Sequence, residues 1–215
     1  MRAVAYGLYQ DRMKAAIHAL KYDRMHPAVR GLGRMLAEAI AQLAAEAPAE
    51  MLVIPVPLHR SKYAQRGFNQ ARSLAAHALG CLRKTHPQWR LTLASSTLMR
   101  LRATESQAGL NSRERRMNVR GAFSVSDPSA VILKHVLIVD DIFTTGATAR
   151  AAALALAQAG AASVWVATLA RARSVNPFRR GASQDAEDDT DLSGNPLAAT
   201  LQGAFIDSSQ DQSSF

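Results

Sequence analysis

Hydrophobic residues recur at helical spacing through most of the first 47 residues. One apolar stripe follows Asp11, a residue type that caps helices. Its members are Met13, Ile17 and Leu20. A second stripe follows Pro27, which suits a first helical turn. Its members are Val29, Leu32, Leu36, Ile40 and Leu43. The two stripes predict a pair of amphipathic helices that ends near Pro48.

Patterns typical of strands begin after this helical pair. They occupy residues 51–56, 92–98, 122–125, 136–139 and 163–170. Short continuous apolar runs, such as 136–139, are typical of strands covered on both faces. Helical spacing returns at 69–82 and at 147–159, where Gly160 closes the second helix. The order strand, helix, strand within 136–170 indicates a parallel βαβ unit, so the sequence predicts an α/β fold with an open, mainly parallel sheet flanked by helices.

Charge is distributed unevenly along the 215 residues. The chain has 26 Lys and Arg against 17 Asp and Glu, and 48% of its residues are hydrophobic, enough for a sizeable core. From Gly181 onward there are seven acidic residues and no basic one, so residues 1–180 hold 26 basic and 10 acidic side chains, a net charge of +16. This excess favours phosphate-bearing ligands or nucleic acid, with a solvated basic surface as the plainer alternative. Residues 176–215 are expected to be a disordered acidic tail.

Composition excludes several classes of protein. No apolar run approaches the ~20 residues that cross a bilayer. No secretory leader follows Met1, so we expect a cytoplasmic protein without membrane insertion. Cys81 is the only cysteine, which excludes an internal disulfide and a zinc site built on Cys-x-x-Cys pairs.

The residues that suggest chemistry follow the strand at 136–139. Asp140 and Asp141 come directly after it, and in open α/β sheets ligands bind beyond this carboxyl end. A turn of small and hydroxyl-bearing residues then opens the next helix. It consists of Thr144, Thr145, Gly146, Ala147 and Thr148. Free N–H groups at a helix N-terminus, hydroxyl donors and a glycine favour phosphate, whereas the carboxylates suit a diol or a divalent cation. The segment therefore predicts a site for ribose 5-phosphate.

Three alternative roles fit the two carboxylates less well. If Asp140 and Asp141 only capped the strand and Thr144 only capped the helix, the arrangement would be costly, because adjacent buried carboxylates need a partner. A phosphoacceptor receiver domain needs another acidic residue after a later strand, but the next one after Asp141 is Asp185 in the tail. A P-loop needs the pattern Gly-x-x-x-x-Gly-Lys-Ser/Thr, which the chain lacks.

The segment 136–148 resembles the phosphoribosyl-pyrophosphate (PRPP) motif of type I phosphoribosyltransferases. Two further stretches, 54–71 and 102–123, resemble the ComF family of competence-related proteins, which includes GntX-like members. They contain Ile54-Pro-Val-Pro-Leu-His-Arg60, Arg66-Gly-Phe-Asn-Gln-Ala71 and Gly121-Ala-Phe123. The similarity runs from about Tyr6 to Ala170. It implies a type I phosphoribosyltransferase core at 51–175 under a small helical hood at 1–50, without the four-cysteine zinc module that begins many ComF proteins.

The resemblance also implies roles for individual residues. Asp140 and Asp141 would be catalytic and would hold Mg²⁺, directly or through water. The pyrophosphate of PRPP would be bound by the loop after the strand at 51–56, through Arg60, Lys62 and Arg66. The long stretch after Leu98 would be a flexible loop that closes the site to water. Its candidate residues are Arg102, Thr104, Gln107, Arg115 and Asn118. The hood, with the segment around Lys21, would cover the site.

The implied activity is transfer of phosphoribosyl from PRPP to an unidentified nitrogen nucleophile, with release of pyrophosphate and Mg²⁺ as cofactor. Thr144 stands where hypoxanthine-type transferases carry an aspartate base, which makes oxopurine salvage a poorer fit. The alternative is a non-catalytic protein of DNA uptake. It would bind single-stranded DNA or proteins of the competence machinery and keep the PRPP site as a sensor or vestige. The basic charge favours this alternative, but few aromatic residues lie near basic segments to stack on bases: Tyr63, Phe68 and Trp89.

Overall fold

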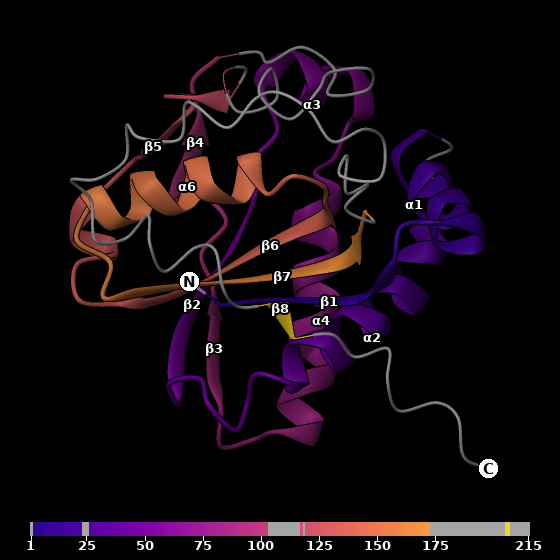
Figure 1. The fold of residues 1–215 in the computed structure, drawn as a ribbon, viewed down its shortest axis with the longest axis horizontal. Helices are drawn as coiled ribbons and strands as arrows, with labels where there is room; N and C mark the ends of the chain where they lie inside the picture. The colour runs from indigo at the N-terminus through magenta and orange to yellow at the C-terminus, as the bar shows by residue number, and fades with distance from the viewer. Residues whose placement is uncertain (1, 23–25, 103–116, 118, 173–204, 207–215) are drawn as a thin grey trace, which may run out of the picture.

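The computed structural model describes residues 2–22, 26–102, 117, 119–172 and 205–206. A parallel sheet with the strand order β3-β2-β6-β7-β1-β8 forms its centre (Figure 1). The strands are β1 (Arg2–Leu8), β2 (Glu50–Pro55), β3 (Arg90–Leu93), β6 (His135–Phe143), β7 (Ser163–Arg171) and β8 (Phe205–Ile206). A separate antiparallel hairpin joins β4 (Leu98–Arg100) to β5 (Phe123–Val125). The predicted open, mainly parallel sheet is confirmed.

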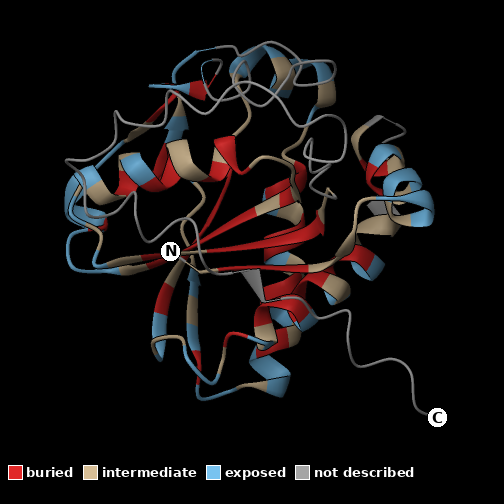
Figure 2. Ribbon diagram, viewed as in Figure 1, coloured by how far each residue is buried: buried red, intermediate tan, exposed pale blue. Residues whose placement is uncertain are grey.

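Helices cover both faces of the sheet. On one face lie α1 (Asp11–Tyr22), α2 (His26–Ala41) and α4 (Gln70–Thr85); on the other lie α6 (Ala147–Gln158) and the β4–β5 hairpin. The remaining elements are the short helix α3 (Arg60–Arg66) and the 3₁₀ turn Pro128–Ala130. Buried residues are concentrated in the sheet and in the helix faces turned toward it (Figure 2). Among the described residues, no helix combines the length and apolar character needed to cross a membrane.

Burial of both faces of β6 explains why its sequence is continuously apolar. Successive side chains of a strand point to opposite faces. Leu137 and Val139 pack in the cluster beneath α2 and α4, whereas Val136 and Ile138 pack in the cluster beneath α6. Both faces of β6 are therefore buried. The strand lies inside the sheet, between β2 and β7, so its carboxyl end has strands on both sides.

The predicted helices are present, but α2 ends at Ala41, before the predicted end near Pro48, and four details of the strand and loop predictions are wrong. The helices predicted from the stripes after Asp11 and Pro27, and at 69–82 and 147–159, are all present as α1, α2, α4 and α6. The strand β1 was not predicted, because its Ala- and Gly-rich sequence carries little strand signal. The strand predicted at 92–98 is instead two strands in different sheets, β3 and β4, and the polar loop after 56 contains α3. Finally, β6 continues past the predicted end at Val139 to Phe143, so Asp140 and Asp141 lie within the strand.

Part of the predicted acidic tail joins the sheet. Within 176–215 the structure describes Phe205–Ile206, which pairs in parallel with Ala3 and Val4 of β1. The other residues predicted to form the tail lie outside the described part of the chain.

Helices α2 and α4 approach closely at Gly33, which allows a stability test. A Cβ added at Gly33 would lie 2.7 Å from the Cβ of His77, whereas one added at Gly31 would meet nothing within 4 Å. We expect Gly33→Ala to lower the free energy of unfolding by about 1–3 kcal/mol through overpacking. Gly31→Ala in the same helix should raise it by up to about 1 kcal/mol, because alanine is the better helix former. Urea unfolding of both variants measures the difference, and equal effects would contradict the close approach.

Candidate functional site

The residues predicted to carry chemistry meet at the carboxyl end of β6. The strand places Asp140 opposite Thr168 of β7, with Asp141 next to it. Asp141 is 5% exposed, and Asp140 is half-buried. Side chains from α1, α4 and β4 converge on these two carboxylates.

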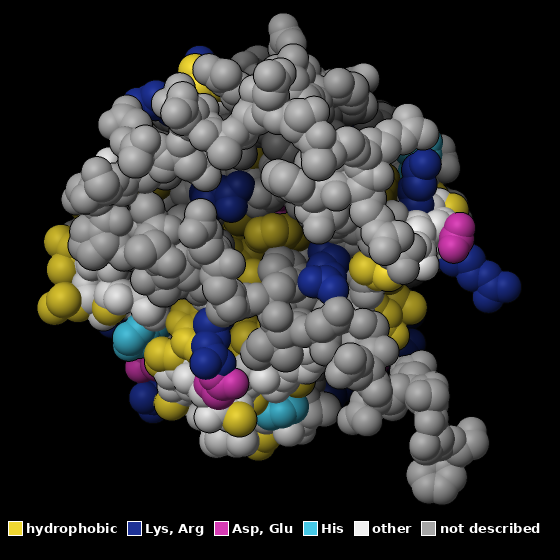
Figure 3. Space-filling view, viewed as in Figure 1, with side chains coloured by type: hydrophobic (Ala, Val, Ile, Leu, Met, Phe, Trp, Pro, Cys, Tyr) yellow, Lys and Arg dark blue, Asp and Glu magenta, His cyan; other side chains and the backbone are white. Residues whose placement is uncertain are grey.

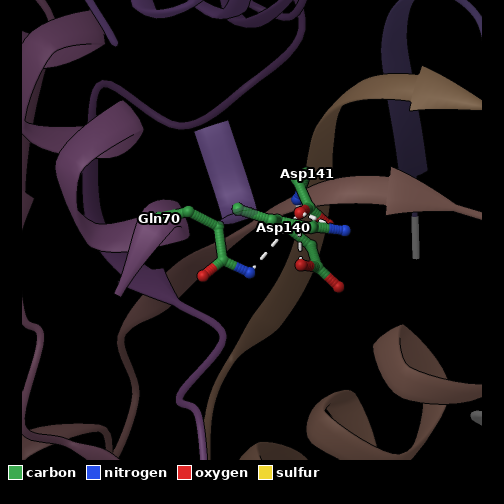
Figure 4. Close-up of polar contacts among 4 residues, drawn as sticks. Gln70, Asp140 and Asp141 are labelled. Carbon is green, nitrogen blue, oxygen red and sulfur yellow. Dashed lines mark hydrogen bonds and ion pairs between the residues drawn. The ribbon is translucent and has the colours of Figure 1, made fainter. Parts of the chain in front are cut away.

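Asp141 is held by two side chains from other elements. The Nζ atom of Lys21, at the end of α1, lies 2.7 Å from Asp141 Oδ2. Gln70, the first residue of α4, donates from Nε2 to the same oxygen at 3.4 Å. Figure 4 shows the Gln70 amide directed at the carboxylate pair. The ion pair is largely shielded from water, since the Lys21 and Asp141 side chains are 19% and 7% exposed, and it ties α1 to the sheet.

Asp140 is in a different electrostatic state from Asp141. Its Oδ1 accepts a hydrogen bond of 2.9 Å from the backbone N–H of Asp141. Burial and the charge of the neighbouring Asp141 nevertheless raise the pKa of Asp140 to about 7; the same hydrogen bond and the Lys21 ammonium oppose the rise. Lys21 thus pairs with the carboxylate of Asp141, whereas ionising Asp140 in the folded protein costs free energy.

This raised pKa predicts that the fold loses stability as pH rises. The folded state keeps a proton on Asp140 that the unfolded chain, with a carboxyl pKa of 3.8, has already released, so stability falls between pH 4 and pH 7. Asp140→Asn cannot ionise and should raise the melting temperature at pH 8 but change it little at pH 4. Calorimetric melting at both pH values tests this, with Glu38→Gln, an exposed carboxylate on α2, as the control. A shift of equal size at pH 4 and pH 8 would contradict the assignment.

Further basic side chains lie near Lys21 and Arg100, the two cations that act on the carboxylates. Burial lowers the pKa of Lys62 on α3, and the nearby charges of Arg100, Arg66 and Lys21 lower it further. Such mutual influence places the four cations within electrostatic reach of one another. Several cations within electrostatic reach of one another are typical of a site that binds a polyanionic ligand.

Arg100 connects this cluster of cations to the carboxylates. Burial lowers its pKa, and the charge of Asp140 acts in the opposite direction. The guanidinium lies 5.4 Å from the ring centroid of Phe123, its partner across the β4–β5 hairpin. The hairpin therefore presents a fixed guanidinium to the carboxyl end of β6, which the sequence pattern did not single out.

The residues predicted to bind pyrophosphate lie on α3. His59 caps the helix by accepting from the backbone N–H of Ser61, and Gly67 ends it in a left-handed conformation with φ of 78°. Lys62 and Arg66 are one helical turn apart on a half-buried face, whereas Arg60 is exposed. The structure therefore brings Lys62 and Arg66 to the cation cluster and leaves Arg60 at the surface.

The predicted phosphate turn connects β6 to α6. Gly146 is the N-cap of α6 with φ of 73°, and as a glycine it has no side chain to cap the helix. A Cβ at Gly146 would lie 2.5 Å from Cζ of Phe143, so a larger residue would force the turn or the ring to shift. Thr145 Oγ1 accepts a 3.4 Å hydrogen bond from the Ala147 N–H. Thr144 and Thr148 are half-buried on either side, which leaves the first turn of α6 with backbone N–H groups suited to an anion.

The predicted flexible loop is described only at its ends. The exposed Arg102 donates through its guanidinium to the backbone oxygen of Arg120 and so joins the two ends of the loop. Thr104, Gln107, Arg115 and Asn118 lie outside the described residues.

The fit of the site to Mg²⁺ depends on the two carboxylates. Within the described part of the chain, no three His, Cys, Asp or Glu side chains gather as they would in an all-protein metal site. Mg²⁺ usually takes one or two carboxylates, several waters and the phosphates of a substrate, and the pair fits that arrangement. Asp140 fits it better than Asp141, because Lys21 and Gln70 already engage Oδ2 of Asp141.

The charged side chains on the surface are mostly basic, in agreement with the net positive charge of the sequence. Lys and Arg side chains lie at several separate places on the described part of the face seen in Figure 3, with acidic side chains beside only some of them. This distribution fits the net charge of +9 for the whole chain.

Comparison with known proteins finds one matching family and several similar individual proteins. The phosphoribosyl transferase domain family matches residues 64–207. The DNA utilization protein YhgH of Salmonella typhi is 34% identical over 175 residues, covering 79% of this chain and 72% of that protein. Competence protein F of Haemophilus influenzae is 28% identical over 174 residues, 80% of this chain and 73% of that protein. Competence protein ComFC of Bacillus subtilis is 28% identical over 166 residues, 76% of this chain and 61% of that protein.

Solved structures of similar fold include the hypoxanthine-guanine phosphoribosyltransferase of Schistosoma mansoni in complex with IMP. The match has a TM-score of 0.39 and 18% identity, and it covers 67% of this chain and 56% of that enzyme, just over half of its length. The family match over residues 64–207 and the 34% identity to YhgH are the stronger findings. They show that this chain has the type I phosphoribosyltransferase fold and belongs to the ComF family.

Proposed function

We propose that this protein binds PRPP at the carboxyl end of β6 and transfers its phosphoribosyl group to a nitrogen nucleophile, releasing pyrophosphate. One observation carries the proposal: two adjacent carboxylates at the end of a central strand are followed at once by the glycine turn that opens α6. The ribose diol of a ribose 5-phosphate matches the carboxylates, and its 5-phosphate matches the turn that follows them.

Each part of PRPP has a matching group in the site. The turn Thr144–Thr148 would bind the 5-phosphate with its hydroxyls and with the N–H groups of α6. The carboxylates of Asp140 and Asp141 would face the ribose, where negative charge favours the cationic transition state at C1. Lys62 and Arg66, with Arg100 within electrostatic reach of Lys62, would neutralise the departing pyrophosphate.

In the proposed reaction the bond from C1 to pyrophosphate breaks, and the electron pair leaves with the pyrophosphate. The lone pair of the nucleophile forms the new C1–N bond, and the nitrogen then releases its surplus proton to solvent. Mg²⁺, when bound, helps to neutralise the leaving diphosphate. Thr144 offers no carboxylate base, so a neutral amine, which needs no deprotonation before attack, fits the turn better than an oxopurine.

A second candidate function is binding of single-stranded DNA without catalysis. Residues 51–104 contain nine basic side chains and no acidic one, and four of the nine are exposed on α3 and α4. These four are Arg60, Arg72, Arg83 and Lys84. A surface of one sign favours a nucleic-acid backbone. The relatives named for DNA utilization and competence suggest the same role.

One assay separates the two functions. Pyrophosphate release from PRPP with Mg²⁺ is measured across a panel of nucleobases and amines, for the wild-type chain, Asp140→Asn and the control Glu38→Gln. Release that is lost only in Asp140→Asn supports the transferase. No release with any nucleophile, together with salt-sensitive binding of single-stranded DNA that PRPP does not change, supports the second function.

A further inference from the structure

The carboxylate pair at the end of β6 already carries a cation that belongs to the protein. The Nζ atom of Lys21 lies 2.7 Å from Oδ2 of Asp141, and the two side chains are 19% and 7% exposed. Burial and the charge of Asp141 raise the pKa of Asp140, and the Lys21 ammonium opposes them. A hydrogen bond between the two carboxyl groups adds to the rise, so the two groups lie next to each other. One ammonium therefore acts on both carboxyl groups.

The packing of α1 holds Lys21 at the carboxylates. Lys21 stands in the last turn of the helix, directly after Leu20. Ile17 and Leu20 are fully buried in the cluster that also contains Leu137 and Val139 of β6. This packing fixes the end of α1 beside the strand, and the negative end of the helix dipole favours a cation there. The ammonium is thus in place before any ligand arrives.

The oxygen that Lys21 contacts has a second donor. Oδ2 of Asp141 also accepts from Nε2 of Gln70, the first residue of α4, at 3.4 Å. Asn69, the N-cap of α4, fixes the backbone beside Gln70 by donating from Nδ2 to the backbone oxygen of Val56 at 3.0 Å. A divalent cation binds through the lone pairs of carboxylate oxygens. At Oδ2 it would have to displace both donors and remain close to a positive charge.

Stability alone does not account for a charged pair at this place. A buried ion pair adds little net stability, because taking both charges out of water costs about as much free energy as their attraction returns. Lys62 is within electrostatic reach of Lys21, and the charges of Arg66 and Arg100 act on it as well. A bare divalent cation therefore meets an unfavourable potential near Asp141, whereas an ion that arrives with phosphate oxygens does not.

We propose that Lys21 is the resident cation of this site and excludes divalent cations from Asp141. The free protein then holds no Mg²⁺ at the carboxylate pair, and Mg²⁺ reaches the site together with a ligand whose phosphate oxygens coordinate it. Lys21 thereby makes the site selective for a metal–phosphate complex over the bare ion. The inference concerns the site of the proposed function and rests on that function for the identity of the ion.

Binding of Mn²⁺ to the full chain tests this role without any phosphate ligand. Mn²⁺ takes the same oxygen ligands as Mg²⁺, and electron paramagnetic resonance measures it directly. Lys21→Met removes the ammonium and leaves the adjacent carboxylates to the metal, so it should bind Mn²⁺ at least about tenfold more tightly than the wild-type chain. Lys21→Gln keeps a hydrogen-bond donor for Asp141 without the charge and should gain affinity too. It carries the test if Lys21→Met does not fold.

Matched variants locate the effect at the carboxylate pair. Lys21→Arg keeps the positive charge and should bind Mn²⁺ as weakly as the wild-type chain. Lys14→Met, exposed on α1, and Lys62→Met, which removes a nearby charge but leaves Lys21 in place, should each change the affinity by less than about threefold. Adding Asp141→Asn to Lys21→Met should abolish the gain. Binding of Mn²⁺ to the acidic residues after Gly181 is common to all these chains and cancels in the comparison.

The melting temperature gives a second readout, which a merely structural ion pair would not move. Without metal, Lys21→Met should melt below the wild-type chain, because Asp141 loses its partner. Saturating Mn²⁺ should then raise the melting temperature of Lys21→Met by about 3 °C or more and change that of the wild-type chain by less than about 1 °C.

Two results would overturn the role of Lys21. One is a wild-type chain that binds Mn²⁺ as tightly as Lys21→Met, and the other is a pair of variants, Lys21→Met and Lys21→Gln, that Mn²⁺ neither binds more tightly nor stabilises. Both results leave the proposed function standing. That function is tested separately by calorimetric titration of the wild-type chain with PRPP and Mg²⁺, where absence of binding overturns it and leaves a gain of Mn²⁺ affinity in Lys21→Met unaffected.

Discussion

Asp140→Asn is expected to lower kcat/KM for PRPP by at least about 100-fold, because the carboxylate stabilises positive charge that is fully developed only in the transition state. The amide has nearly the same shape, so the variant removes charge and little else. Asp140 also faces Arg100, which loses its nearby opposite charge in the variant. The loss should therefore appear in kcat, since the neutral side chain still permits ground-state contacts with the sugar.

Asp141→Asn should behave differently, which sharpens the test. Removing this charge leaves the largely buried Lys21 ammonium without its partner, and such a change typically costs about 3–5 kcal/mol of stability. Asp140→Asn, by contrast, relieves a charge that burial disfavours. Steady-state kinetics and melting temperatures of both variants, with Glu38→Gln as control, give the comparison. If Asp140→Asn retained kcat within about threefold, the catalytic role of Asp140 would be wrong.

Gly146→Ala is expected to weaken the binding of ribose 5-phosphate and inorganic phosphate by more than about tenfold, because two separate penalties fall on the turn that would hold the phosphate. A left-handed backbone conformation costs a non-glycine residue about 1–2 kcal/mol, and φ here is 73°. The added methyl would also lie 2.5 Å from the ring of Phe143. Either the turn or the ring must shift, and the N–H groups at the start of α6 would move with it.

Gly67→Ala is the matched control for this second prediction. Gly67 has φ of 78°, but a Cβ there would meet nothing within 4 Å, so it carries the backbone penalty alone. Gly146→Ala should therefore lower the melting temperature more than Gly67→Ala, and adding Phe143→Leu to Gly146→Ala should recover part of the difference. Equal losses in the two glycine variants, with phosphate binding intact in Gly146→Ala, would contradict the steric argument.

The central β6–α6 unit was predictable because its signals are local and agree with one another. A continuous apolar run, two carboxylates, a glycine and an Ala-rich helix each indicate the same arrangement. The end of β6 was misplaced because polar residues within a strand look like the start of a loop. Asp140 pairs with Thr168 of β7 through the backbone, and backbone pairing leaves no trace in side-chain hydropathy.

The partners of Asp141 were harder to foresee for a physical reason. Lys21 and Gln70 lie 120 and 71 residues away in sequence, and each stands at a helix end where a polar residue is ordinary. Only the packing of α1 and α4 beside β6 brings them to the same oxygen. Arg100 was similarly hidden among the many arginines of its segment, and its distinction is its place in the β4–β5 hairpin against Phe123. Strand β1 escaped detection because its pairing with β7, distant in sequence, supplies the stability that its own residues lack.

Diffraction from crystals grown with PRPP and Mg²⁺ tests the central claim most directly. The account predicts that the 5-phosphate lies at the start of α6, against Thr144–Thr148, with the ribose facing Asp140 and the pyrophosphate toward Lys62 and Arg66. PRPP bound at any other place on the chain, or a site at the end of β6 that stays empty at saturating PRPP, would contradict it.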